Sequence, residues 1–284
     1  MVDGWRFGVH LKYAVSNVAR YIWHMRVIER LPDDLLAAGQ SAVTTEEIAQ
    51  RLGRDPALLR SGLARLKSKR QLFSPAKGLY VPVPPEYRSW GVIPAEQFID
   101  RLMGHLHRQY YVALLSAAEM HGVAHHAPQL FQVMVDRQLR PKHIERVRLR
   151  FYVGRRVGDD RGIELRTVRT GTVRLCSKEL MLLDLVEYPQ AAAGLGNVAT
   201  IVREIGPLDM PLLATLAAGR PRAMIRRLGW LLDRFASQMD ATALLVIADG
   251  SSGAADPLAT DGPSSGDVDR KWGVIVNDEV EPEL

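Results

Sequence analysis

The chain has 284 residues, of which 47% are hydrophobic, and a formal net charge of +5 at pH 7. This length suits two domains, with ample apolar residues for their cores. The single cysteine, Cys176, excludes an intramolecular disulfide and favours a reducing cytoplasm. Met1–Lys12 lacks the apolar core of a signal peptide, and no run reaches the ~20 apolar residues of a membrane span. We therefore expect a cytoplasmic protein that contacts no membrane.

Residues 1–40 predict a helical extension. Its helix covers about Val9–Arg30 and is expected to end at Leu31-Pro32, because proline disfavours continuation of a helix. The aromatic side chains of this segment are expected to pack on the next domain or on a second subunit.

Residues 41–83 predict a winged helix-turn-helix. The expected elements are a helix at Thr45–Leu52, a helix from Pro56 to about Arg70, and strands at Gln71–Ser74 and Leu79–Val83. Gly53 is expected to end the first helix, and Asp55 followed by Pro56 supplies an N-cap and a first-turn proline for the second. Lys77-Gly78 is expected to be the turn of a hairpin, which is the geometry of a wing.

The second predicted helix has an apolar stripe and an opposite face of small and basic residues. The residues predicted to contact DNA are Arg60, Ser61, Ala64 and Arg65 in the major groove, and Arg54, Lys67 and Lys77 at phosphates or in the minor groove. Ser41–Val83 contains eight basic and three acidic residues, a net charge of +5 that equals that of the whole chain. The alternative is a small helical domain that binds protein.

The rest of the chain predicts a linker at 84–94, a mixed domain at 95–248 and an acidic tail at 249–284. In the mixed domain we expect helices at Ala95–His107, Ser116–His121, Lys178–Tyr188, Asn197–Glu204, Leu208–Ala217 and Pro221–Met239, and strands at Tyr110–Leu114, Leu130–Asp136, Val147–Val153 and Thr172–Leu175. The tail is rich in Gly, Ser, Asp and Pro and has a net charge of −7. This composition predicts a mostly disordered segment, in which Lys271–Val276 is a candidate for docking.

Several spaced segments resemble the AbiEi family of antitoxins from type IV toxin–antitoxin systems. They are Pro84–Ser89, Tyr110–Asp136, the RxRFY strand at Arg148–Tyr152, Ser177–Pro189 and Gly194–Ala199. The resemblance covers most of residues 41–240, without the N-terminal helix and the tail. We therefore expect an α+β (mixed α/β) protein: a winged helix-turn-helix domain, a larger α/β antitoxin domain and an acidic disordered tail.

The resemblance implies a protein that binds operator DNA at inverted repeats and represses its own operon. Its second domain would oppose a cognate nucleotidyltransferase-like toxin without forming a stable complex. The family supplies no catalytic residues to carry over, so we assign none and expect no enzymatic activity, no cofactor and no metal. Both a monomer and a dimer suit an inverted repeat.

Three other patterns keep alternatives open. His105, His107, His121, His125 and His126 could hold zinc, although no cysteine pair or HExxH spacing accompanies them. A metal-dependent nucleic-acid enzyme would use Asp136 with a later Glu-x-Lys, whereas the chain has Glu164-Leu-Arg166. Cys176 beside Ser177 at a helix start could have a lowered thiol pKa, or could be a small buried hydrophobe. A transcriptional regulator that senses a small ligand is a further alternative.

A second basic run lies in the mixed domain. Between Arg101 and Arg174 there are 14 basic and six acidic residues. We hypothesise a second nucleic-acid surface formed by Arg148, Arg150 and Arg155. The alternative is a solvated strand face and loop.

Overall fold

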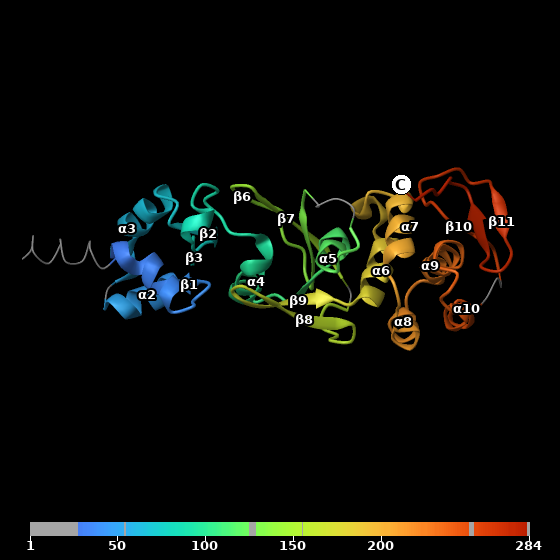
Figure 1. Ribbon diagram of the computed structural model, residues 1–284, viewed down its shortest axis with the longest axis horizontal. Coiled ribbons are helices and arrows are strands. Elements are labelled where there is room, and N and C mark those ends of the chain that lie inside the picture. The colour runs from blue at the N-terminus through green and yellow to red at the C-terminus, as the bar shows by residue number, and fades with distance from the viewer. Residues whose placement is uncertain (1–27, 54, 125–128, 155, 250–252, 283–284) are drawn as a thin grey trace, which may run out of the picture. The chain divides into compact units, whose positions relative to one another are not determined.

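The computed structural model describes residues 28–53, 55–124, 129–154, 156–249 and 253–282 (Figure 1). Within these residues the chain forms two compact units. Unit 1 contains the residues up to His107, together with Lys142–Val147 and Val168–Gly171, and unit 2 contains the remainder. Helices and strands occur in both units, so the fold is mixed α+β.

Unit 1 combines short helices with a three-stranded sheet. Its elements are a helix at residues 28–37, β1 (Val43–Thr44), α2 (Thr45–Leu52), α3 (Pro56–Ser68), β2 (Leu72–Ala76), β3 (Leu79–Pro82), the 3-10 turns η1 (Pro85–Tyr87) and η2 (Ala95–Gln97), and α4 (Ile99–His105). The strands lie in the order β1-β3-β2, with antiparallel pairing throughout. The two helices and two strands predicted between Thr45 and Val83 are therefore present.

The ends of α2 and α3 follow from the local sequence. Thr44 Oγ1 accepts a hydrogen bond from the Glu47 backbone N–H at 3.2 Å, and Glu47 Oε2 accepts one from the Thr44 N–H at 2.7 Å. Gly53 ends α2 with a φ of 59°, in the left-handed region that glycine adopts without strain. Asp55 caps α3 by accepting a hydrogen bond from the Ala57 N–H at 2.7 Å. The predicted roles of Gly53 and Asp55 are confirmed.

The first described helix corrects one prediction. Residues 28–37 are helical without interruption, so the predicted helix end at Leu31-Pro32 is wrong. Ile28 and Leu35 are buried, and their packing outweighs the one backbone hydrogen bond that proline cannot donate. The earlier part of the predicted Val9–Arg30 helix lies outside the described residues.

This helix shares an apolar core with α2 and α3. Ile28, Ile48, Leu63 and Leu66 all belong to one buried cluster. An ideal Cβ on Gly62 would lie 2.4 Å from Ile28 Cδ1, so the glycine permits close approach of α3 to the helix at 28–37. The structure thus joins part of the predicted N-terminal extension to the helix-turn-helix core.

Unit 1 also continues through the predicted linker at 84–94. Val92 and Ile93 are buried, and the Phe98 ring packs edge-on against Phe73 of β2, with ring centroids 5.1 Å apart. The predicted helix at Ala95–His107 is present in two pieces, η2 and α4. This segment is therefore part of the core of unit 1.

Unit 2 is built on a mixed sheet. Its elements are β4 (Tyr110–Val112), α5 (Leu114–Met120), β5 (Phe131–Val135), β7 (Val147–Val153), β8 (Ile163–Val168), β9 (Gly171–Cys176), α6 (Lys178–Glu187), η3 (Pro189–Ala192), α7 (Leu195–Glu204), α8 (Met210–Ala217), α9 (Arg222–Phe235) and α10 (Thr242–Ile247). β6 (Lys142–Ile144) precedes β7 in the chain and belongs to unit 1, and the strands of unit 2 lie in the order β7-β5-β4-β9-β8. β4 and β5 pair antiparallel, whereas β5–β7 and β4–β9 pair parallel. Across the described chain, no helix has the length and apolar character needed to cross a membrane.

The strands and helices predicted for the mixed domain are present, with ends that differ by a few residues. β7 has the predicted bounds, and its burial alternates: Leu149 and Phe151 are buried, while Arg148 and Arg150 are exposed. β6, β8 and α10 are absent from the prediction. β8 contains half-buried and exposed residues only, so it lacks the apolar period that reveals a strand in a sequence.

The acidic tail is folded over residues 253–282, so the predicted disorder is wrong there. β10 (Asp256–Pro257), β11 (Asp267–Asp269) and β12 (Val274–Val276) form a three-stranded sheet in the order β10-β12-β11. Trp272 is only 1% exposed, and its ring lies against Gly229 of α9. Average composition fails here because a few buried side chains, Leu258, Trp272 and Val274 among them, anchor a polar segment.

Candidate functional site

The exposed face of α3 is the first candidate site. Arg60, Ser61, Ala64 and Lys67 are exposed, on the side opposite the buried leucines. Neither Arg60 nor Lys67 forms an ion pair with a described residue. The face therefore combines small side chains, which permit close approach, with cations that pair with no acid among the described residues and that suit phosphates and base edges.

Arg65 differs from the other α3 residues predicted to contact DNA. Its Nη2 lies 3.5 Å from Glu29 Oε1, and Lys69 Nζ lies 3.7 Å from the same oxygen. Glu29 belongs to the helix at residues 28–37, and the Arg65 side chain is half-buried beside it. Arg65 is thus drawn toward a carboxylate of its own chain.

Lys77 lies at the turn of the β2–β3 hairpin. Gly78, the next residue, has a φ of 80°, which this turn requires. His105 Nε2 lies 3.0 Å from the Lys77 carbonyl oxygen, so α4 contacts the turn while the Lys77 side chain stays exposed. Arg54, the other predicted phosphate contact, lies outside the described residues.

The second basic run is partly neutralised. Its ion pairs include Arg161 with Asp159, Arg174 with Asp160 and Arg169 with Glu86. Arg148 and Arg150 are exposed on β7. Arg155 lies outside the described residues, so only two members of the hypothesised surface can be placed.

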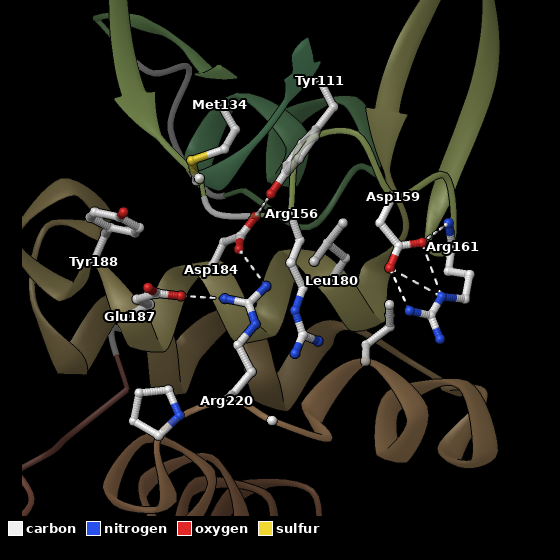
Figure 2. A pocket seen from close by; sticks show the side chains of 14 residues that line it. Tyr111, Met134, Arg156, Asp159, Arg161, Leu180, Asp184, Glu187, Tyr188 and Arg220 are labelled. Carbon is white, nitrogen blue, oxygen red and sulfur yellow. Dashed lines mark hydrogen bonds and ion pairs between the residues drawn. The ribbon is translucent and has the colours of Figure 1, made fainter. Parts of the chain in front are cut away.

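Unit 2 contains a cavity of about 140 Å³, whose lining side chains are drawn in Figure 2. Its charged lining residues are Arg156, Asp159, Arg161, Asp184, Glu187 and Arg220. Tyr111, Met134, Leu180, Tyr188 and Leu216 are among the residues that complete the wall. The lining thus contains three guanidinium groups and three carboxyl groups.

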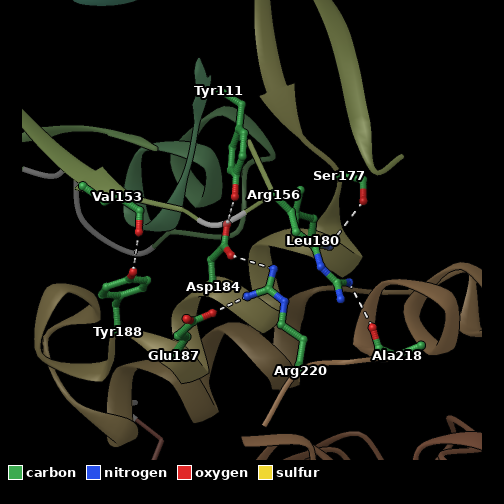
Figure 3. A network of polar contacts seen from close by, with 10 residues as sticks. All are labelled: Tyr111, Val153, Arg156, Ser177, Leu180, Asp184, Glu187, Tyr188, Ala218 and Arg220. Atoms are coloured by element: carbon green, nitrogen blue, oxygen red, sulfur yellow. Dashed lines mark hydrogen bonds and ion pairs between the residues drawn. The ribbon is translucent and has the colours of Figure 1, made fainter. Parts of the chain in front are cut away.

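A polar network centred on Asp184 of α6 forms one wall of this cavity (Figure 3). Tyr111 Oη donates a hydrogen bond to Asp184 Oδ2 at 2.9 Å, and Arg220 Nη2 lies 3.3 Å from Asp184 Oδ1. Arg220 Nη1 also donates to a carboxylate oxygen of Glu187. Arg156 Nη1 donates to the Ala218 carbonyl oxygen at 2.9 Å. The network therefore ties β4 and α6 to the turn before α9.

Burial governs the protonation of this network. Removal from water raises the pKa of Asp184 to about 7, although Arg220 and the Tyr111 hydroxyl act in the opposite direction. Burial and the nearby Asp184 raise the pKa of Tyr111 well above its usual range, so its hydroxyl stays protonated as a donor. At the edge of the cavity, hydrogen bonds from Arg161 lower the pKa of Asp159 to about 2. Asp184 is thus the group of this cavity that titrates near neutral pH.

The other chemical patterns of the sequence are not brought together. Within the described ranges, no three His, Cys, Asp or Glu residues are placed to hold a metal ion. His121 Nε2 lies 2.8 Å from the Cys176 carbonyl oxygen, and His125 and His126 lie outside the described residues. Burial raises the pKa of the Cys176 thiol well above its usual range, so the lowered thiol pKa is wrong. Asp136, the acid of the metal-dependent alternative, forms an ion pair with its neighbour: Asp136 Oδ2 lies 3.8 Å from Arg137 Nε.

The sequence gives a partial signal for the network. Asp184 interrupts the apolar run Leu180–Val186 inside α6, and an acid at such a position is rarely buried without a partner. Arg220 is 36 positions further along the chain, and no periodicity links the two residues. The acid could have been singled out, but its partner could not.

Comparison with known proteins defines the class of unit 2. Residues 111–234 match the family described as the AbiEi antitoxin C-terminal domain. This segment is therefore an AbiEi antitoxin domain, which confirms the resemblance over these residues. The family consists of antitoxins from toxin–antitoxin systems.

A solved structure shows a similar fold. The crystal structure of the RV2827C protein from Mycobacterium tuberculosis aligns with a TM-score of 0.64 over 87% of this chain and 90% of that chain. The two sequences are 16% identical, so the likeness concerns the fold alone. No curated protein matches the chain significantly.

Proposed function

We propose that the chain is a DNA-binding antitoxin of a type IV toxin–antitoxin system. Unit 1 binds inverted repeats upstream of its own operon and represses transcription. Unit 2 counteracts a nucleotidyltransferase-like toxin without forming a stable complex with it. The match of residues 111–234 to the AbiEi antitoxin domain is the observation that carries this proposal.

The element order of unit 1 supports its role as a winged helix-turn-helix. α2 and α3 are separated by a short turn, and the β2–β3 hairpin follows α3 in the position of a wing. In this proposal α3 enters the major groove, with base contacts from Arg60, Ser61, Ala64 and Arg65 and phosphate contacts from Arg54, Lys67 and Lys77. Because Arg65 faces Glu29, its contact with DNA competes with an internal ion pair.

A second nucleic-acid surface at Arg148, Arg150 and Arg155 remains part of the proposal. The exposed positions of Arg148 and Arg150 on one face of β7 support it. This surface would contact DNA beside the operator or the RNA substrate of the toxin.

A growth-rescue assay tests the antitoxin function directly. The open reading frame next to the gene for this chain is expressed in a host, with and without the full chain. Both genes are driven by promoters foreign to the operon, so repression cannot account for rescue. We expect growth arrest that the full chain relieves. Toxicity that the full chain leaves unchanged would contradict neutralisation by unit 2.

A further inference from the structure

Unit 1 exposes an aromatic side chain outside α3 and the hairpin. Trp90, in the turn after η1, is 42% exposed, and the Arg146 Cζ lies 5.5 Å from the centre of its ring. The Tyr87 ring also lies near the indole, with ring centroids 5.6 Å apart. The exposed indole therefore contacts both an aromatic ring and a guanidinium group.

This stack lies beside the end of α3. Arg70, two residues after the last residue of α3, donates a hydrogen bond from Nη1 to the Ser89 carbonyl oxygen at 2.7 Å. An ideal Cβ on Gly91 would lie 3.4 Å from Arg70 Cδ and 3.5 Å from Glu145 Cγ. The segment from Ser89 to Gly91 is therefore held between Arg70 and the β6–β7 turn that carries Arg146.

The cations of this region differ in their partners. Arg65 and Lys69 share an ion pair with the single carboxylate of Glu29, and Asp33 Oδ1 lies 3.3 Å from Arg88 Nη2. Arg70 and Arg146 form no ion pair with any residue that the structure describes. Their charges are thus available to an external anion, as are those of Arg60 and Lys67 on α3.

We propose that Arg70, Trp90 and Arg146, here termed the Trp90 surface, form a second contact of unit 1 with duplex DNA. This inference rests on the proposed binding of α3 to an operator. A guanidinium held over an indole by a cation–π contact still has N–H groups that can donate to phosphate oxygens. Arg70 lies two residues after the end of α3 and bonds to Ser89, so the surface adjoins the helix that the proposal places on the duplex, and its contacts would be with the phosphate backbone. The Trp90 surface positions DNA and adds no base readout.

The test measures affinity of the full chain for a duplex of the DNA immediately upstream of its own reading frame, over a range of salt concentrations. For Arg146→Ala we expect about 3–10-fold weaker binding, and a salt slope smaller by ~0.9, the value for one lost phosphate contact. For Trp90→Ala we expect a similar loss with little change in slope, because no charge is removed. Arg146→Lys and Trp90→Phe are expected to bind closer to the wild type.

Arg234 supplies a matched control. Its Cζ lies 5.6 Å from the centre of the Trp230 ring, it is exposed, and it belongs to unit 2. Arg234→Ala removes the same charge and the same kind of stack, and is expected to leave DNA affinity and salt slope unchanged. Thermal unfolding of each variant shows whether the fold is retained. We expect that it is, because the substituted side chains are exposed.

Several outcomes would overturn the Trp90 surface as a DNA contact. They are unchanged affinity and slope in Arg146→Ala, an equal loss in Arg234→Ala, a loss confined to single-stranded RNA, and lost toxin neutralisation with intact DNA binding. The last would assign the surface to a protein partner. Failure of the proposed function is distinguishable, because the wild-type chain would then bind the upstream duplex no better than a duplex of scrambled sequence.

Discussion

Asp184 is a buried acid in the middle of an apolar helix, held by two donors. The cost of burying its charge raises its pKa to about 7, so near neutral pH the carboxyl exchanges between two forms. The ionised carboxylate pairs with Arg220, which also pairs with Glu187. At the scale of one residue, the charge of this ion pair therefore depends on a proton.

This protonation has a consequence for stability. The folded pKa of about 7 exceeds the unfolded value of ~3.9, so the contribution of Asp184 is fully present below about pH 4 and is lost as the pH rises through 7. In Asp184→Asn no such loss occurs. We expect the unfolding free energy of Asp184→Asn, relative to that of the wild type, to be about 2–3 kcal/mol higher at pH 8 than at pH 5. Urea unfolding at a series of pH values measures this difference.

Tyr111→Phe is the control for this prediction. It keeps the carboxyl group and removes the hydroxyl that lowers the pKa of Asp184, so the pH-dependent loss should move upward from about 7. A stability difference between Asp184→Asn and the wild type that stays constant from pH 5 to pH 8 would show that Asp184 does not titrate in this range.

At the scale of elements, α9 is the support on which the tail folds. Arg226 of α9 is fully buried and donates from Nη1 to the Ala254 carbonyl oxygen at 3.0 Å and to Asp256 Oδ2 at 2.9 Å. Trp272 Nε1 donates to Asp233 Oδ2 at 2.7 Å, and its ring fills the space above Gly229. Two side chains thus fix a segment that composition describes as disordered.

A single methyl group on α9 tests this packing. In Gly229→Ala the new Cβ would lie 2.1 Å from Trp272 Cζ3, so we expect a loss of about 1–3 kcal/mol in the free energy of unfolding. Gly104→Ala in α4 is the matched control, because its Cβ would meet nothing within 4 Å. It is expected to stabilise by about 0.5–1 kcal/mol.

The same measurement in a Trp272→Ala background checks the cause. Without the indole, alanine at position 229 should cost little more, which a double-mutant cycle detects. An equal cost of Gly229→Ala in both backgrounds would show that the clash with Trp272 is not the reason.

The sequence predicts features that depend on residues close together in the chain, and it misses features that depend on residues far apart in the chain. The caps at Gly53 and Asp55 and the alternation of β7 depend on neighbours within a few positions, and the structure confirms them. The pairing of Asp184 with Arg220 and the packing of Trp272 against α9 depend on residues tens of positions away. Local spacing carries no information about such partners.

At the scale of the whole molecule, the proposal gives repression and neutralisation to different units. Arg60 is exposed on α3 in unit 1, and the AbiEi antitoxin domain begins at residue 111. A change confined to the exposed face of α3 leaves the core of both units intact, since it removes no buried contact. The two activities should therefore separate by mutation.

Arg60→Ala is expected to weaken specific operator binding by ~1–3 kcal/mol, the usual effect of a lost bidentate base contact, and to retain growth rescue. Lys77→Ala should weaken binding equally to all sequences and lower the salt slope by about 1. Arg270→Ala, an exposed arginine of unit 2, is the charge-matched control and should bind as the wild type. Operator affinity that is unchanged in Arg60→Ala would reject the docking of α3.

Unit 1 draws its residues from three separate stretches of the chain, the last of which ends at Gly171. The chain is synthesised from its N-terminus to its C-terminus. The contact of Arg146 with Trp90 and the ion pair of Arg169 with Glu86 therefore form only after the second and third stretches of unit 1 have been synthesised. A nascent chain interrupted before Gly171 cannot complete unit 1. Synthesis of unit 1 is therefore complete only after residues 108–141 and 148–167 of unit 2 have also been synthesised.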